Sequence, residues 1–195
     1  MQTKYHKTNK LGQVSDPMSQ KTGTLGSDTC PKYEHIVHPF LPLYDENSTI
    51  LILGSLPSVK SREQMFFYGH PQNRFWKVIA ALTGEDVPTE IEEKKALLHK
   101  HHIALWDTIY SCDIVGSSDS SIKNVVPTDI MPIIRNSKIT RVFCNGSTSG
   151  KYYKRYQQKD TGIEAVVLPS TSPANAAFSL EKLIKAWNIG LGTSG

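Results

Sequence analysis

The central segment of the chain reads GSLPSVKSREQMFFYGHPQNRFWKV, residues 54–78. It follows an apolar run, residues 49–53 (TILIL), whose short length and β-branched side chains predict a buried parallel strand. Gly54 and Pro57 end that strand in a tight polar loop, and ligands of open α/β sheets bind at the loops that follow the strands. Asn73 precedes an apolar segment with helical spacing, so we expect its carboxamide to cap that helix and to face the loop.

The order of strand, Gly/Ser/Pro loop and helix occurs twice more, over residues 140–158 and 164–187. Right-handed crossovers would place the strands side by side in one sheet, with all the loops at the same edge. We therefore predict an α/β fold, a three-layer α/β/α sandwich with a central, mostly parallel sheet. In this fold Asn73, Asn145 and the loop 169–175 would converge.

Outside the central segment, the patterns predict strands over 103–109, 140–144 and 164–168, helices over 88–102, 127–136, 151–158 and 174–187, and a Ser- and Asp-rich loop over 110–127. Thr89 is the predicted N-cap of the first of these helices. Asp107, Asp113 and Asp119 are candidate carboxylates. Turn and capping chemistry is the alternative for them, and we favour it for Asp119.

Length and composition set broad limits. A chain of 195 residues predicts one domain with its own core. The hydrophobic content of 38% and charged content of 21% suit a soluble globular protein. The net charge of +4 is mildly basic, which is compatible with a nucleic-acid partner but does not by itself favour one.

The ends of the chain differ from its middle. Residues 1–32 are rich in Gln, Lys, Thr, Ser and Gly without apolar periodicity, so we expect a flexible extension. The folded domain is predicted over 33–190, and residues 191–195 form a tail. No run approaches the roughly 20 apolar residues of a membrane span, and the N-terminus lacks the apolar core of a secretory signal.

The three cysteines, Cys30, Cys112 and Cys144, are widely spaced. They form no CxxC pair, no zinc-type spacing with histidine and no four-cysteine cluster set. Reduced thiols and the absence of a metal site are therefore expected.

Two common motifs fit the segment GSTSGK, residues 146–151, poorly. A phosphate-binding loop needs four residues between its glycines and Ser or Thr after the lysine, whereas here there are three and Tyr152 follows. A nucleophile elbow needs a central serine and a histidine later in the chain, whereas the centre is Thr148 and the last histidine is His102.

A third interpretation rests on resemblance. The chain resembles the hypoxanthine-DNA glycosylase family (family 6, the DNA-deoxyinosine glycosylases) of the uracil-DNA glycosylase superfamily over roughly residues 39–189. The segments that carry the resemblance are GSLPSVKSRE at 54–63, HPQNRFW at 70–76, SSDSSIKNVVP at 117–127, FCNG at 143–146 and LPSTSPANA at 168–176.

The resemblance implies a monofunctional DNA glycosylase that removes deaminated bases, chiefly hypoxanthine, by hydrolysing the N-glycosidic bond in base excision repair. It implies no cofactor, a DNA partner (double- or single-stranded) that carries a deaminated base, no membrane association, a monomer and, in a prokaryote, a cytoplasmic, nucleoid-associated location. The implied catalytic residues are Asn73 and Asn145. The implied base pocket comprises Gly54, Ser55, Leu56, Pro57, Phe67, Tyr68 and His70, and the implied DNA contacts are Ser58, Lys60, Ser61, Gly146, Ser170, Thr171, Ser172, Pro173 and Ala174.

Some residues depart from the superfamily's patterns. Leu56 stands where the mismatch-specific branch has asparagine, and the first loop holds no carboxylate where other branches use aspartate to activate water. Ser170 to Ser172 replace the histidine of the classical uracil enzymes. Because the loops lack a general base, a non-catalytic α/β module that binds DNA or nucleotides remains the alternative.

Overall fold

The computed structural model describes residues 32–191, with side chains as far as Asn188. The predicted extension over 1–32 and tail over 191–195 therefore lie, apart from Lys32 and Leu191, outside the described residues. The domain boundaries stay predictions.

Four parallel strands form the central sheet in the order β3-β2-β6-β7. They are β2 (Ile50–Gly54), β3 (Ile103–Asp107), β6 (Arg141–Asn145) and β7 (Ala165–Leu168). Every residue of β2 and β3 is buried, as expected for strands that are covered on both faces. The predicted strands 49–53, 140–144 and 164–168 are confirmed to within one residue at each end.

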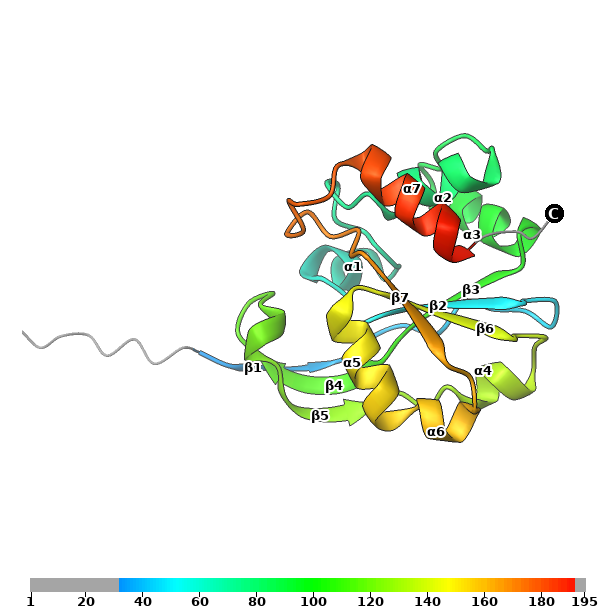
Figure 1. The fold of residues 1–195 in the computed structure, drawn as a ribbon. Helices are drawn as coiled ribbons and strands as arrows, with labels where there is room; N and C mark the ends of the chain where they lie inside the picture. Colours follow the sequence, from blue (N-terminus) through cyan, green and yellow to red (C-terminus); the bar gives the residue numbers. More distant parts are fainter. Residues whose placement is uncertain (1–31, 192–195) are drawn as a thin grey trace, which may run out of the picture. The chain divides into compact units, whose positions relative to one another are not determined.

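Helices cover both faces of this sheet. They are α1 (Val59–Gln64), α2 (Phe75–Thr83), α3 (Ile91–Lys100), α4 (Met131–Arg135), α5 (Ser147–Tyr156), α6 (Gln158–Thr161) and α7 (Leu180–Leu191), with a 3₁₀ turn η1 at Asp119–Ser121. Figure 1 shows α2, α3 and α7 on one face of the sheet and α4, α5 and α6 on the other. The predicted three-layer α/β/α architecture is confirmed.

A second, antiparallel sheet was not predicted. It consists of β1 (Glu34–Val37), β4 (Ile109–Ile114) and β5 (Lys123–Pro127) in the order β1-β4-β5. The predicted loop 110–127 is therefore wrong, since most of it lies in β4, η1 and β5. Two register shifts between β4 and β5 interrupt the regular alternation of inward and outward side chains, which hides the strand pattern in the sequence.

Four predicted helix starts also differ from the structure. Helix α4 begins at Met131 rather than at 127. Glu90, not Thr89, is the N-cap of α3, where it forms a capping box with Glu93. Helix α5 begins at Ser147, so most of the predicted loop 145–150 is helical. Helix α7 begins at Leu180 rather than near 174, so the loop after β7 is longer than predicted.

One apolar core joins the sheet to its helices. Phe75, Ile79 and Trp187 are fully buried, and the ring of Phe75 meets that of Trp187 edge to face at 5.9 Å. Burying side chains of this size contributes about 1.5–3 kcal/mol each. Helices α2 and α7 are thereby fixed relative to each other, which also fixes the two loops that precede them.

Candidate active site

A cleft of about 840 Å³ lies at the carboxyl ends of β2, β6 and β7. Its walls include the three predicted loops, together with residues 114 and 116–120 beside the second sheet. The predicted site residues that line it are Gly54, Ser55, Leu56, Pro57, Ser58, Ser61, Phe67, Tyr68, Asn73, Asn145, Gly146, Ser170, Thr171, Ser172 and Ala174. His70, Lys60 and Pro173 are not among the lining residues.

The Asn73 carboxamide is held by two hydrogen bonds to its oxygen. Asn73 Oδ1 accepts from the backbone N–H of Phe75 at 3.0 Å and from Thr171 Oγ1 at 2.9 Å. The backbone N–H can only donate, so the orientation of the amide is fixed. The predicted capping contact is present, although by its backbone dihedrals Arg74 occupies the N-cap position. Asn73 Nδ2 has no acceptor among the described residues and is available to a ligand in the cleft.

This arrangement leaves the Asn73 carbonyl oxygen unable to orient a water molecule. A carbonyl oxygen has two lone pairs, and both are occupied by protein donors. The chemistry that remains to Asn73 is hydrogen-bond donation.

Asn145 at the end of β6 makes two hydrogen bonds to Thr171. Asn145 Oδ1 accepts from the Thr171 N–H, and Asn145 Nδ2 donates to Thr171 Oγ1, each at 2.9 Å. The predicted convergence of Asn73, Asn145 and the loop after β7 is therefore confirmed, with Thr171 as the point of contact. Thr171 is fully buried and its hydroxyl is occupied by these contacts, so the hydroxyl is not free to bind a phosphate.

The serines of the first loop have internal partners as well. Ser58 caps α1 by accepting from the Ser61 N–H at 3.2 Å. Ser61, only 2% exposed, accepts from the Gly69 N–H at 3.0 Å and so joins the two ends of the segment 58–69. A phosphate contact through the Ser61 side chain does not fit this geometry.

Two further predicted contacts lie away from the cleft. Lys60 is exposed and forms an ion pair with Glu63 at 2.7 Å. His70 Nδ1 accepts from the Gln72 N–H at 3.2 Å, which stabilises the turn before Asn73. The structure thus assigns His70 a turn contact outside the predicted base pocket.

Arg74 was not predicted as a site residue, although it holds the loop after β7. Its guanidinium donates to the carbonyl oxygens of Thr171, Ser172, Asn175 and Phe178. The Arg74 backbone N–H also donates to Thr171 O, at 3.1 Å. Five donors on one planar group suit this task, which a lysine could not perform. The signal in the sequence was the adjacency of Arg74 to Asn73.

Tyr68 forms an aromatic wall of the cleft. Its ring stacks on Phe75 with centroids 3.8 Å apart, and its backbone is left-handed with φ 52°. Burial, and then the nearby carboxylate of Asp107, raise the pKa of Tyr68. The phenol therefore keeps its proton and can donate a hydrogen bond.

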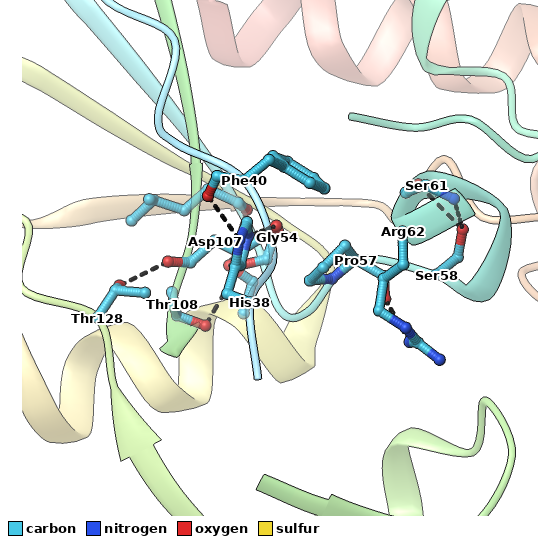
Figure 2. A network of polar contacts seen from close by, with 12 residues as sticks. His38, Phe40, Gly54, Pro57, Ser58, Ser61, Arg62, Asp107, Thr108 and Thr128 are labelled. Atoms are coloured by element: carbon cyan, nitrogen blue, oxygen red, sulfur yellow. Dashed lines mark hydrogen bonds and ion pairs between the residues drawn. The ribbon is translucent and has the colours of Figure 1, made fainter. Parts of the chain in front are cut away.

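A buried carboxylate also lines the cleft. Asp107 ends β3 directly beside Gly54 at the end of β2, and it is 5% exposed. His38 Nε2 lies 2.9 Å from Asp107 Oδ2, and His38 Nδ1 lies 3.1 Å from Phe40 O (Figure 2). This corrects the expectation that the site lacks a carboxylate. Sequence patterns marked Asp107 as a candidate carboxylate without placing it in the site.

The described residues contain no group of three or more His, Cys, Asp or Glu side chains that is arranged to hold a metal ion. None of the helices between residues 32 and 191 is long and apolar enough to cross a membrane.

Comparison with known proteins agrees with this fold. The model of the uracil DNA glycosylase superfamily matches residues 41–189, and the chain belongs to that superfamily. A hypoxanthine DNA glycosylase from Methanosarcina acetivorans is 38% identical over 142 residues, which cover 72% of this chain and 89% of the relative. One from Methanosarcina barkeri is 34% identical over 155 residues, covering 76% and 93% respectively.

A solved structure is also similar. It is the solution NMR structure of a candidate uracil DNA glycosylase from Methanosarcina acetivorans, with a TM-score of 0.67 and 33% sequence identity. The match covers 77% of this chain and 94% of the solved one. The superfamily's fold thus accounts for nearly all of the described residues.

Proposed function

We propose that the protein is a monofunctional DNA glycosylase that removes deaminated bases, chiefly hypoxanthine, from DNA. The superfamily match and the two relatives named hypoxanthine DNA glycosylase support this function. The observation that carries it is the Asn73 amide, because a fixed network leaves its Nδ2 donor free at the cleft.

The reaction hydrolyses the bond between C1′ of the deoxyribose and N9 of the base. Negative charge builds on the departing base while the sugar becomes oxocarbenium-like. A donor that is held in place before the reaction stabilises such charge without reorganisation. Hypoxanthine offers acceptors at its ring nitrogens and O6, and Asn73 Nδ2 is the proposed donor to one of them.

Asn145 and Thr171 act in this proposal through Asn73. The chain of hydrogen bonds from Asn145 Nδ2 to Thr171 Oγ1 and on to Asn73 Oδ1 supports a fixed direction for the catalytic amide. Asn145 also lines the cleft. Discrimination between bases is its second proposed role.

The rest of the cleft suits an extruded nucleotide. Tyr68 and the nearly buried Phe67 are the proposed aromatic walls of the base pocket, with residues 54–57 as its floor. Ser58, Ser170 and Ser172 are half-exposed and are the proposed phosphate contacts, while exposed Pro173 and Ala174 are the proposed wedge. Flipping a base costs a few kcal/mol, and less at a mispair such as hypoxanthine with thymine.

Hydrolysis without a covalent intermediate is part of the proposal. None of the described residues that line the cleft is a lysine, so the lining offers no amine for a Schiff base. We further propose that the protein acts as a monomer on double- or single-stranded DNA, without a cofactor, and in a prokaryote in the cytoplasm with the nucleoid.

The test is cleavage of labelled oligonucleotides that carry one inosine, xanthine or uracil, followed by alkali to break abasic sites. The proposal predicts strand breaks at inosine that depend on both enzyme and alkali, that persist with EDTA, and that give no borohydride-trapped adduct. Binding of all the oligonucleotides without any cleavage would instead identify a non-catalytic DNA-binding module.

A further inference from the structure

The Asp107 carboxylate has no part in the mechanism so far. Its Oδ2 is hydrogen-bonded to His38 Nε2, whereas its Oδ1 receives no hydrogen bond from the described residues. Among the described residues, the fully buried side-chain polar atoms that lack a partner are Trp76 Nε1 and Gln157 Oε1, and Asp107 Oδ1 is not one of them. Because Asp107 lines the cleft, its free oxygen is the one that reaches solvent there.

Gly54 leaves the space that this oxygen occupies. A Cβ added to Gly54 would lie 2.1 Å from Asp107 Oδ1, far closer than such atoms approach in proteins. The same Cβ would lie 3.5 Å from the Tyr68 hydroxyl, so the carboxylate oxygen and the phenol both lie beside Gly54 at the end of β2. Glycine at position 54 therefore allows the carboxylate to enter the cleft beside the proposed base pocket.

The backbone of Asp107 and Thr108 is fixed by buried hydrogen bonds. Thr128 Oγ1 donates to Asp107 O at 2.6 Å, and the Thr108 N–H donates to Gly54 O at 2.9 Å. Gln157 Nε2 donates to Thr108 O at 3.1 Å. Figure 2 shows Asp107 between His38 and the Gly54 segment, with Thr108 and Thr128 beside it. The carboxylate is thus held before any substrate binds.

The partners of His38 determine the charge of the pair. Phe40 O can only accept, so Nδ1 carries a hydrogen. If Asp107 is ionised, Nε2 must carry a second hydrogen to donate to it, which makes the ring an imidazolium. The His38 side chain is fully buried, and a buried charge requires such a partner. In its ionised form the pair therefore presents Asp107 Oδ1 to the cleft, and the positive charge of His38 lies on the buried side of the carboxylate.

We propose that Asp107 is a catalytic residue of the proposed glycosylase, whose Oδ1 orients the attacking water and accepts its proton, and that His38 is its positioning residue. In this step the C1′–N9 bond breaks and its electron pair leaves with the base. A C1′–O bond forms to the water, and the proton that the water loses passes to Asp107 and from there to the base or to solvent. The carboxylate also stabilises the positive charge that develops on the sugar. This inference rests on the proposed function.

The direct test is Asp107→Asn in single-turnover cleavage of an inosine duplex. The amide nitrogen of the substituted side chain can donate to an uncharged His38, so the variant should stay folded. General-base catalysis contributes about 10²–10⁴-fold, so we expect a loss of that order with binding to an abasic-site duplex changed less than about threefold. Asp113→Asn is the matched control, because Asp113 forms a surface pair with His35 at 2.8 Å on β4, outside the cleft lining. It should cleave at the wild-type rate.

Gly54→Ala provides a steric test that keeps the carboxylate. The added Cβ displaces Oδ1 and should lower the rate about tenfold or more. In an Asp107→Ala background the same change should have a much smaller effect, since the clashing oxygen is gone. Equal losses in both backgrounds would contradict the role of Oδ1.

His38→Gln and His38→Ala together test the positioning role. Glutamine keeps a donor to Asp107 Oδ2, whereas alanine removes it. If His38 positions the carboxylate, the single-turnover rate should fall about tenfold or more in His38→Ala and be largely restored in His38→Gln, with binding to an abasic-site duplex changed less than about threefold. A packing role alone would lower the stability of His38→Ala and leave the rate of the folded variant at the wild-type level.

The outcomes separate the two proposals. If the wild-type protein does not cleave inosine DNA, the proposed function fails. If it does and Asp107→Asn is equally active, or Asp107→Asn loses DNA binding as much as cleavage, only the role of Asp107 is overturned.

Discussion

Thr171 Oγ1 donates a 2.9 Å hydrogen bond to Asn73 Oδ1, across 98 residues of sequence. The contact joins the loop after β7 to the start of α2. It also turns the Asn73 amide so that its donor nitrogen is free. The position of the loop and the orientation of the proposed catalytic amide are therefore coupled through one buried hydroxyl.

Thr171→Val should reduce the single-turnover rate by about tenfold or more, since it keeps the shape of the side chain and removes the hydroxyl. Asn145 Nδ2 then loses its acceptor, and an unpaired buried polar group costs about 1–3 kcal/mol of folding stability. Thr171→Ser is the matched control and should retain most of the rate. Urea unfolding and cleavage of an inosine duplex measure the two effects, and a fully active Thr171→Val would exclude the coupling.

Arg74→Lys should release the loop after β7. One ammonium cannot reach the four carbonyl oxygens that the guanidinium contacts, and each hydrogen bond from a charged group contributes about 1.5–3 kcal/mol. We expect a loss of at least about 2 kcal/mol in the free energy of unfolding and faster proteolysis within residues 169–179. Arg135→Lys, on the exposed end of α4, is the control and should match wild type in both measurements. Equal stability of the Arg74 and Arg135 variants would contradict this account of the loop.

The capping contacts of Glu93 predict how the stability of the fold depends on pH. Its carboxylate accepts from the N–H groups of Thr89 and Glu90, which lowers the pKa of Glu93 from the ordinary 4.5. A carboxyl group whose pKa is lower in the folded than in the unfolded protein stabilises the fold at pH values above its unfolded pKa. This contribution is lost as the pH falls through its folded pKa. The Tm advantage of wild type over Glu93→Gln should therefore be present above pH 4.5 and shrink below it. Thermal unfolding followed by circular dichroism measures this difference in Tm. A difference that becomes larger as the pH falls below 4.5 would contradict the prediction.

The sequence was sufficient for the central sheet because β2, β6 and β7 each contain an apolar run that leads directly into Gly54, Asn145 or Pro169. It was also sufficient for the convergence of Asn73 and Asn145 on the loop after β7, since parallel strands present their carboxyl ends at one edge. The antiparallel sheet was missed because β4 is irregular and contains polar Ser111 and Asp113.

The Asp107–His38 pair could not be found from local patterns. Its members are 69 residues apart in the sequence, and no local pattern around either residue points to the other. The late start of α7 has a similar cause, because Arg74 binds the carbonyl oxygens of the preceding loop. Long-range hydrogen bonds of this kind leave no periodic signal in the sequence.

Asn73→Asp isolates the donor that the proposed mechanism requires. Aspartate keeps an oxygen for the Phe75 N–H and the Thr171 hydroxyl, so stability should match wild type, whereas Asn73→Ala should lose about 1 kcal/mol with the cap. Both variants should bind an abasic-site duplex within about threefold of wild type, because the proposed phosphate contacts lie on other residues.

The most direct test is the single-turnover rate of Asn73→Asp on a duplex with one inosine, measured beside wild type. Loss of one fixed donor predicts a rate lower by about 10²–10³-fold in a folded protein that still binds DNA. A rate near that of wild type would mean that the Asn73 nitrogen does not act on the departing base, and the proposed mechanism would be wrong.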